Sequence, residues 1–296
     1  GDADATDERP LARNTSSRFD LGRNFCNKLW NATRFALGNM ETPAEAGGEQ
    51  PSLADRWIVS RLHRTLHEVE DSLSVYQFNR YAEAMYDFIW RDFCDWYLEA
   101  VKPTVRDRRD QQRRLHAVLD AILRMLHPAC PFVTETLWPH LRGLDAVRPT
   151  DGTGLPGVTL PAADRCVIAA WPGLDDSTAD EEADLEFGRV QSLVAAIRNL
   201  RGERRVPPKR RIVLHAPPAV LELVVAAGGS VETLAGLEVV TAEAEAPAGA
   251  LPLALEGGQV LLSNLVDAVD VGAERARLAK AIEGKRKQVA GFKGKL

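Results

Sequence analysis

The side chains best suited to chemistry in this 296-residue chain are guanidinium and amide groups that recur near its start. Arg23, Asn27, Asn31 and Arg34 follow one another at intervals of 4, 4 and 3, and Lys28 lies beside them. Because an α-helix has about 3.6 residues per turn, this spacing places the set on one helix face. Arginine can bind phosphate or a guanine edge, and asparagine can pair with adenine through two hydrogen bonds. The pattern indicates a nucleic-acid-binding face, and a plain solvated face explains it equally well.

A second basic segment, RNLRGERRVPPKRR, spans residues 198–211 and holds seven Lys/Arg against one Glu. It crosses the end of a predicted helix and the loop that follows, where long cationic side chains can meet a phosphate backbone. We expect Arg198, Arg201, Arg204 and Arg205 to make such contacts. Complementation of the helix dipole together with solubility is an equally good explanation.

The last 24 residues, 273–296, carry eight Lys/Arg and two Glu. Apolar residues recur in this segment at alternating intervals of 4 and 3, which is a coiled-coil pattern, and Lys285 interrupts it. An isolated amphipathic helix is marginal in water, so the segment needs a partner. We interpret it as the first half of a truncated helical hairpin that lies along RNA, with Lys285, Arg286 and Lys287 as backbone contacts.

Several patterns of common catalytic and metal sites do not occur in the sequence. GxxxxGK[ST], GxSxG and HExxH are missing, and the four cysteines form no CxxC pair. His63 and His67 lie one turn apart without a third ligand, so we expect two solvated histidines. The acidic side chains fall on polar helix faces with no sign of burial. We therefore predict no catalytic residue, no metal site and no cofactor in this chain.

Composition is that of a globular protein, with 45% hydrophobic and 27% charged residues and a net charge of −5. No apolar run reaches the roughly 20 residues that cross a bilayer. The cysteines are expected to be reduced, partly buried thiols of a cytoplasmic protein. The charged start has no signal-peptide core, so we interpret residues 1–17 as a flexible leader or the cut end of a larger protein.

The apolar periodicity predicts a mainly α fold that begins with a helical bundle over residues 18–176. Its second helix is expected to begin after a Ser52 cap that faces Asp55. Its third helix carries an aromatic stripe from Phe78 to Tyr97, which we assign to the core rather than to base stacking. The predicted helices are 19–37, 53–73, 77–101, from Asp107 onward with a stripe at Leu115–Leu126, and 127–141.

A small α+β module is predicted over residues 177–270. Its helix runs from about Ala179 to Leu200, with acidic residues first and basic residues last, as the helix dipole favours. A strand-like piece, CVIAAW (166–171), precedes the module. Further strands are expected at 210–216, 237–242, 251–256 and 259–263, with a helix at 217–227, and residues 271–296 begin the coiled-coil arm.

Five segments resemble valyl-tRNA synthetases, which are class I aminoacyl-tRNA synthetases, in the same order along the chain. GRNFCNKLWNATRF (22–35) is similar to the helix that opens their anticodon-binding bundle. The other segments are LADRWIVSRL (53–62), YAEAMYDFIWRDFCDWYLE (81–99), HPACPFVTETLW (127–138) and AAIRNLRGERRVPP (195–208). The tail resembles the ascending helix of that family's carboxy-terminal coiled-coil arm. The likeness covers about residues 18–296.

The resemblance implies a parent enzyme that joins valine to its tRNA with ATP and magnesium and hydrolyses mischarged threonine elsewhere. The family's HIGH and KMSKS signatures do not occur here, so we expect a tRNA-binding fragment that is inactive alone. The absence of paired cysteines favours valyl over isoleucyl relatives, which commonly end in a zinc module. We expect a monomer, with pairing possible through the truncated arm.

In that interpretation Arg23, Asn27, Lys28, Asn31 and Arg34 read the anticodon of valine tRNA. Two alternatives remain open at this point. One is a freestanding RNA-binding factor without anticodon preference, and the other is a helical module that binds protein.

Overall fold

The computed structural model describes residues 17–45, 50–144, 146–148, 155–175, 179–255, 258–265 and 282. The chain divides into two compact units. The first comprises the chain up to Ser192 together with Glu222–Leu234, and the second comprises Leu193–Leu221 and the chain from Ala235 onward. The first boundary falls inside a single helix, α7 (Glu181–Glu203). All but one residue of the predicted arm, and all but one of the predicted leader, lie outside the described residues.

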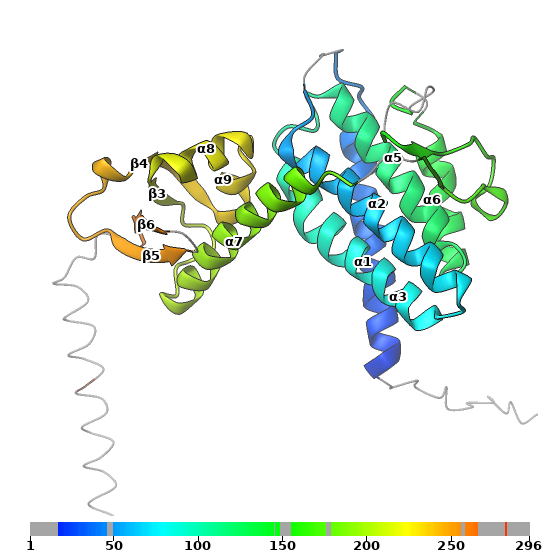
Figure 1. The fold of residues 1–296 in the computed structure, drawn as a ribbon, viewed down its shortest axis with the longest axis horizontal. Coiled ribbons are helices and arrows are strands. Elements are labelled where there is room, and N and C mark those ends of the chain that lie inside the picture. The colour runs from blue at the N-terminus through cyan, green and yellow to red at the C-terminus, as the bar shows by residue number, and fades with distance from the viewer. Residues whose placement is uncertain are drawn as a thin grey trace, which may run out of the picture. The chain divides into compact units, whose positions relative to one another are not determined.

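The first unit contains a bundle of packed helices (Figure 1), which confirms the mainly α prediction. Its central helix is α5, along which every residue from Leu115 to Leu126 is buried. The expected apolar stripe of this helix is buried, and the polar residues His116, Asp120 and Arg124 between its members are buried too, because neighbouring elements surround the helix. The bundle elements are α1 (Ser17–Met40), α2 (Leu53–Ser74), α3 (Phe78–Tyr86), the π-helix η1 (Asp87–Tyr97), α4 (Leu98–Val101), α5 (Arg109–Leu126) and α6 (Pro131–Arg142).

The aromatic stripe of the third predicted helix forms core, as expected, over α3, η1 and α4. Tyr81, Phe88, Phe93 and Tyr97 are all buried. Phe78 is an exception, because it lies in the first turn of α3 and 61% of it is exposed. The helix ends at Val101, two residues before Pro103, which lacks the backbone donor that a helix interior needs.

The predicted cap of α2 is present and has a further role. Ser52 Oγ accepts from the backbone N–H of Asp55, and the Asp55 carboxylate accepts in return from Ser52 N. This carboxylate is fully buried and also accepts from Tyr97 Oη at 2.9 Å and from Gln111 Nε2 at 3.0 Å. The expectation that acidic groups lie only on polar faces is therefore wrong. Asp55 ties α2 to η1 and α5.

Two further local predictions are corrected in the first unit. CVIAAW does not form a strand, because Cys166–Ile168 is a short 3₁₀ helix, η2, with Cys166 buried and Val167 exposed. The only strands around it in the described residues are β1 (Val158–Thr159) and β2 (Gly173–Leu174), which pair antiparallel. His63 is not solvated, since it is buried and its Nε2 lies 2.8 Å from the Pro156 carbonyl oxygen. His67 is exposed, as expected.

The second unit contains a four-stranded sheet in the order β4-β3-β6-β5. β3 and β4 run parallel, and the other neighbours run antiparallel. Parallel neighbours need a crossover connection, and here α8 and the unpredicted α9 lie between them in the chain. All four predicted strands are present. The elements of the sheet region are β3 (Ile212–Ala216), β4 (Leu237–Ala242), the 3₁₀ helix η3 (Glu243–Glu245), β5 (Leu251–Leu255) and β6 (Gly258–Ser263). Between β3 and β4 in the chain lie α8 (Pro218–Ala226) and α9 (Ser230–Ala235), whose residues from Glu222 to Leu234 belong to the first unit.

His215 links three of these strands from the middle of the sheet. Its Nε2 lies 2.8 Å from Ser263 Oγ on β6, and its Nδ1 lies 2.7 Å from Thr241 Oγ1 on β4. Both ring nitrogens of this buried residue are thus satisfied, as a polar group in a core requires.

All four cysteines are free thiols, and Cys94 and Cys166 are buried. Among the described residues, no helix combines the length and apolar character that a bilayer crossing demands.

Candidate nucleic-acid interface

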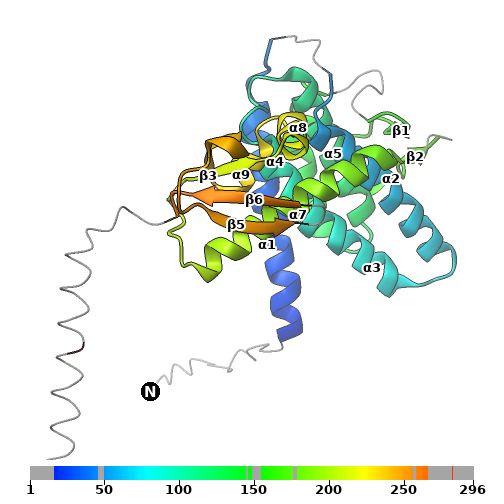
Figure 2. The same cartoon turned by 60° about the vertical axis from the view of Figure 1, so that its left-hand side comes forward.

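The polar face predicted on the first helix is present on α1. Arg23, Asn27, Asn31 and Arg34 are all exposed. In both views of the chain, the first turns of α1 extend beyond the neighbouring helices of the bundle (Figures 1 and 2). Arg23 also forms an exposed ion pair at 2.8 Å with Asp20, one turn earlier. Such a pair is worth little in water, so it leaves the guanidinium available to a phosphate.

Lys28 differs from the other members of the predicted set. Its Nζ lies 2.5 Å from Asp95 Oδ1 and 3.9 Å from the centre of the Trp90 ring, and both partners belong to η1. Its side chain is only 25% exposed. The ammonium is thus engaged within the bundle, and Lys28 fixes α1 against η1.

The opposite face of α1 is apolar and packs into the bundle. Phe25, Leu29 and Ala36 are buried. The Phe25 ring stacks on Tyr86 at a centroid distance of 5.6 Å, and Tyr86 stacks on Trp90 at 5.4 Å. This aromatic column sets the rotation of α1 about its axis. Since residues at helical spacing keep a fixed angular relation, burying Phe25 and Leu29 turns Asn27 and Asn31 outward.

The basic segment 198–211 in the second unit is organised around Arg201. Its guanidinium donates to four backbone carbonyl oxygens, at distances between 3.0 and 3.4 Å. Burial lowers the pKa of Arg201, and the nearby charge of Arg211 acts in the same direction. We expected Arg201 to contact a phosphate backbone, whereas here its donors close the turn. The four acceptors are Gly236, Pro207, Pro208 and Arg210.

Gly236 shows how closely Arg201 approaches the chain. Its φ is +69°, a region that favours glycine, and a Cβ built there would lie 3.4 Å from Arg201 Nη1. A larger residue would therefore strain the backbone and press on the guanidinium.

Other cations of this segment lie at the surface. Arg198, Arg204 and Arg205 are exposed, and Arg205 has a φ of +51° in the turn that follows α7. Arg210 is half-buried and donates to the Asn264 carbonyl oxygen at 3.3 Å. Arg201 thus shapes a loop that presents its neighbours to solvent. The other predicted backbone contacts, Lys285, Arg286 and Lys287, lie outside the described residues.

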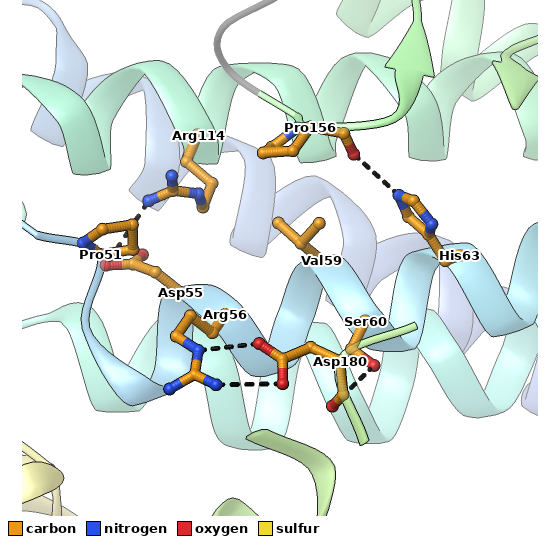
Figure 3. A pocket seen from close by; sticks show the side chains of 9 residues that line it. All are labelled: Pro51, Asp55, Arg56, Val59, Ser60, His63, Arg114, Pro156 and Asp180. Atoms are coloured by element: carbon orange, nitrogen blue, oxygen red, sulfur yellow. Dashed lines mark hydrogen bonds and ion pairs between the residues drawn. The ribbon is translucent and has the colours of Figure 1, made fainter. Parts of the chain in front are cut away.

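The two arginines that line a pocket of about 190 Å³ in the first unit face carboxylates and not solvent alone (Figure 3). Arg56 donates two hydrogen bonds to the Asp180 carboxylate, of 2.8 and 3.0 Å, and one of 2.7 Å to Glu182. Arg114 lies 3.8 Å from the buried Asp55. Because each cation here faces carboxylates, the pocket offers little net positive field to a nucleic acid.

Other buried carboxylates in the bundle also belong to ion pairs. Burial raises the pKa of Asp120 and of Asp92, while Arg124 and Arg61 respectively oppose the shift as bonded partners. A structural ion pair accounts for each of them, so neither is a strong candidate for general acid or base.

The sequence carries little information on the internal contacts of Lys28 and Arg201. Trp90 and Asp95 lie on another helix, so their distance from Lys28 in the sequence does not predict the contact. The Pro207-Pro208 pair does mark a turn, but it does not identify the side chain that closes it.

Comparison with known proteins gives a family and two relatives. The model of the anticodon-binding domain of tRNA ligases matches residues 55–216. A valine–tRNA ligase of Dechloromonas aromatica is 39% identical over 308 residues, which cover 95% of this chain and 30% of that protein. A valine–tRNA ligase of Thermotoga maritima is 35% identical over 280 residues, which cover 94% of this chain and 30% of that protein. The chain therefore spans about a third of the length of these relatives.

Proposed function

We propose that this chain, which belongs to the family of anticodon-binding domains of tRNA ligases, binds the anticodon stem-loop of valine tRNA. The main support is the outward face of α1, where Asn27, Asn31 and Arg34 are exposed while the opposite face is packed. Proteins read RNA sequence mostly on unpaired loop bases, whose edges are free for hydrogen bonds. A rigid helix that presents amides and guanidinium groups suits that task.

The side chains have different roles in this proposal. Asn27, Asn31 and Arg34 meet base edges, and Arg23 meets a base or the adjacent phosphate. Lys28 holds the helix in place from its contacts with η1.

Backbone contacts come from elsewhere in the chain. Arg198, Arg204 and Arg205 supply them from the basic turn, and Arg201 keeps that turn in shape. Lys285, Arg286 and Lys287 add diffuse attraction to RNA.

The parent protein in this proposal is a valine–tRNA ligase of the cytoplasm. It uses ATP and magnesium to join valine to tRNA, and the chemistry takes place in a part that carries the HIGH and KMSKS signatures. The present chain supplies binding and selection. We therefore expect the isolated chain to bind valine tRNA without charging it.

The test is a titration of the chain with a valine tRNA transcript and with the same transcript carrying a swapped anticodon. We expect the swap to cost about 1–3 kcal/mol, which is roughly 5- to 150-fold in Kd. Asn31→Ala should remove most of this difference. Asn79→Ala is the matched control, because Asn79 is an exposed asparagine on α3, outside the proposed face.

Two outcomes would contradict the proposal. Equal binding of both transcripts at every salt concentration would indicate an RNA-binding module without anticodon preference. No binding at moderate salt would favour a protein-interaction module.

A further inference from the structure

Three side chains with different metal-binding chemistry lie together in the first unit, where α5, α6 and η2 approach one another. They are the imidazole of His127, the carboxylate of Glu135 and the thiol of Cys166, and their ligand atoms all lie within 4.8 Å of one another. From this cluster we infer a binding site for a zinc-type divalent cation that joins η2 to the corner between α5 and α6. The sequence predicted no metal site, because His127 and Cys166 are 39 positions apart and the three ligands have no recognisable spacing.

The imidazole of His127 is held by a side-chain contact. Its Nδ1 lies 2.7 Å from Thr134 Oγ1, and the carbonyl oxygens of Cys130 and Pro131 lie 2.9 and 3.1 Å from the same hydroxyl. This contact orients the ring, and a neutral imidazole keeps one nitrogen lone pair for a cation. Metal-binding histidines typically have such an outer hydrogen bond.

The Glu135 carboxylate is also held by a hydrogen bond. Glu135 Oε2 accepts from the backbone N–H of Val167 at 2.9 Å, which leaves its second oxygen for a cation. Val167 follows Cys166 directly, so the same hydrogen bond aligns two of the three ligands. A carboxylate that is fixed by an outer hydrogen bond loses little freedom when it binds a metal.

The thiol has weak hydrogen-bond partners in the protein. Cys166 is buried, its Sγ donates to the Leu123 carbonyl at 3.5 Å, and it also has a hydrogen bond with the Thr134 side chain. Burial raises the pKa of this thiol to about 12. A bound cation supplies the positive charge that stabilises the thiolate, and the displaced proton passes to solvent.

Distances and charges both suit zinc. Tetrahedral zinc keeps ligand atoms about 3.3–3.7 Å apart, so these side chains need to converge by roughly 1 Å. The thiolate and the Glu135 carboxylate together balance the charge of a divalent cation. Nearby Arg124 is balanced by its own partner, Asp120. Three protein ligands leave a fourth position for water.

The experiment uses the full 296-residue chain, reduced and stripped of metal by chelation. Added Co²⁺, a spectroscopic substitute for Zn²⁺, should give a sulfur-to-cobalt charge-transfer band and the intense visible bands of tetrahedral coordination. Zn²⁺ should abolish these bands at one equivalent. Zn²⁺ should also raise the Tm, because a ligand that binds only the folded state stabilises it.

Three variants separate a metal site from a structural hydrogen-bond cluster. Cys166→Ser should lose the charge-transfer band and weaken Zn²⁺ binding by more than about 100-fold, because the thiolate is gone. Glu135→Gln keeps an oxygen for Val167 and should weaken binding by about 10- to 100-fold. Cys94→Ser, which changes a buried thiol on η1, should leave the charge-transfer band and the Zn²⁺ affinity unchanged. An unchanged Co²⁺ spectrum in Cys166→Ser, or no thiolate band in the unmodified chain, would overturn the inference.

Discussion

Two segments of this molecule use their arginines differently. On α1, Arg23 and Arg34 lie on an outward face whose position is set by apolar packing behind it. In residues 198–211, the central Arg201 is turned inward and binds four carbonyl oxygens. Counting cations therefore overstates the binding surface of the second segment. An arginine has five N–H donors, and a loop with unsatisfied carbonyls can use them as readily as a phosphate can.

The largest expected effect comes from removing the inward arginine. Arg201→Ala leaves four carbonyl oxygens without their donor and should lower the free energy of unfolding by about 2–3 kcal/mol. Arg204→Ala, at an exposed position three residues away, should change it by less than about 0.5 kcal/mol. Urea denaturation of both variants measures the difference. Equal effects would remove the contrast between the inward and the outward arginine.

The next effect concerns RNA binding by exposed arginines of the two segments. Arg34→Ala should cost about 1–3 kcal/mol with the valine anticodon and relax the preference for it. Arg204→Ala should weaken binding of all tRNAs alike and reduce the salt slope by about 1. Titrations at several salt concentrations with matched and swapped anticodons separate base reading from phosphate contact. A uniform loss in Arg34→Ala would assign α1 to backbone binding only.

Lys28 tests whether the polar residues of α1 all have the same role. Because its ammonium is bound to Asp95 and Trp90, Lys28→Ala should cost about 0.5–1 kcal/mol of stability. Its effect on anticodon preference should be small beside that of Asn31→Ala. Thermal unfolding and tRNA titration on the same preparation give both values. A strong loss of preference at unchanged stability would place Lys28 among the base-reading residues.

The smallest expected effect is a pH dependence that distinguishes Arg56 from Arg201. Hydrogen bonds from Arg56 lower the pKa of Asp180, so this contact stabilises the fold above the ordinary aspartate pKa of about 3.9. The stabilisation is lost as pH falls through the lower, folded-state value. Asp180→Asn should flatten this acid limb of the stability curve, while Arg201→Ala should leave its slope unchanged, since carbonyls do not titrate. Urea denaturation between pH 6 and pH 3 measures both.

Local patterns predicted much of the fold, and the misses share a cause. The Ser52 cap, the acidic start of α7 and the four strands of the sheet depend on neighbours in sequence, and all are present. The strand expected at 166–171 is wrong because Glu135, 32 positions away, binds Val167 and helps to hold a 3₁₀ turn. Phe78 is exposed although its spacing fits the core stripe, because it begins the helix at the edge of the bundle.

The candidate sites also contain some features that near neighbours in sequence determine and others that depend on distant elements. The outward direction of Asn27 and Asn31 follows from helical periodicity, since apolar residues on the opposite face must be buried. The internal use of Lys28 and the meeting of His127 with Cys166 depend on elements that are distant along the chain.

By itself, the sequence determined which helix faces are polar, where helices begin and where cationic residues gather, because these follow from the chemistry of near neighbours. Only the tertiary structure decided which cations remain free for a partner. Hydrogen bonds and ion pairs act over a few ångströms in space regardless of separation in the chain, so the carbonyls around Arg201 and the carboxylates around Arg56 could be found only in the folded molecule.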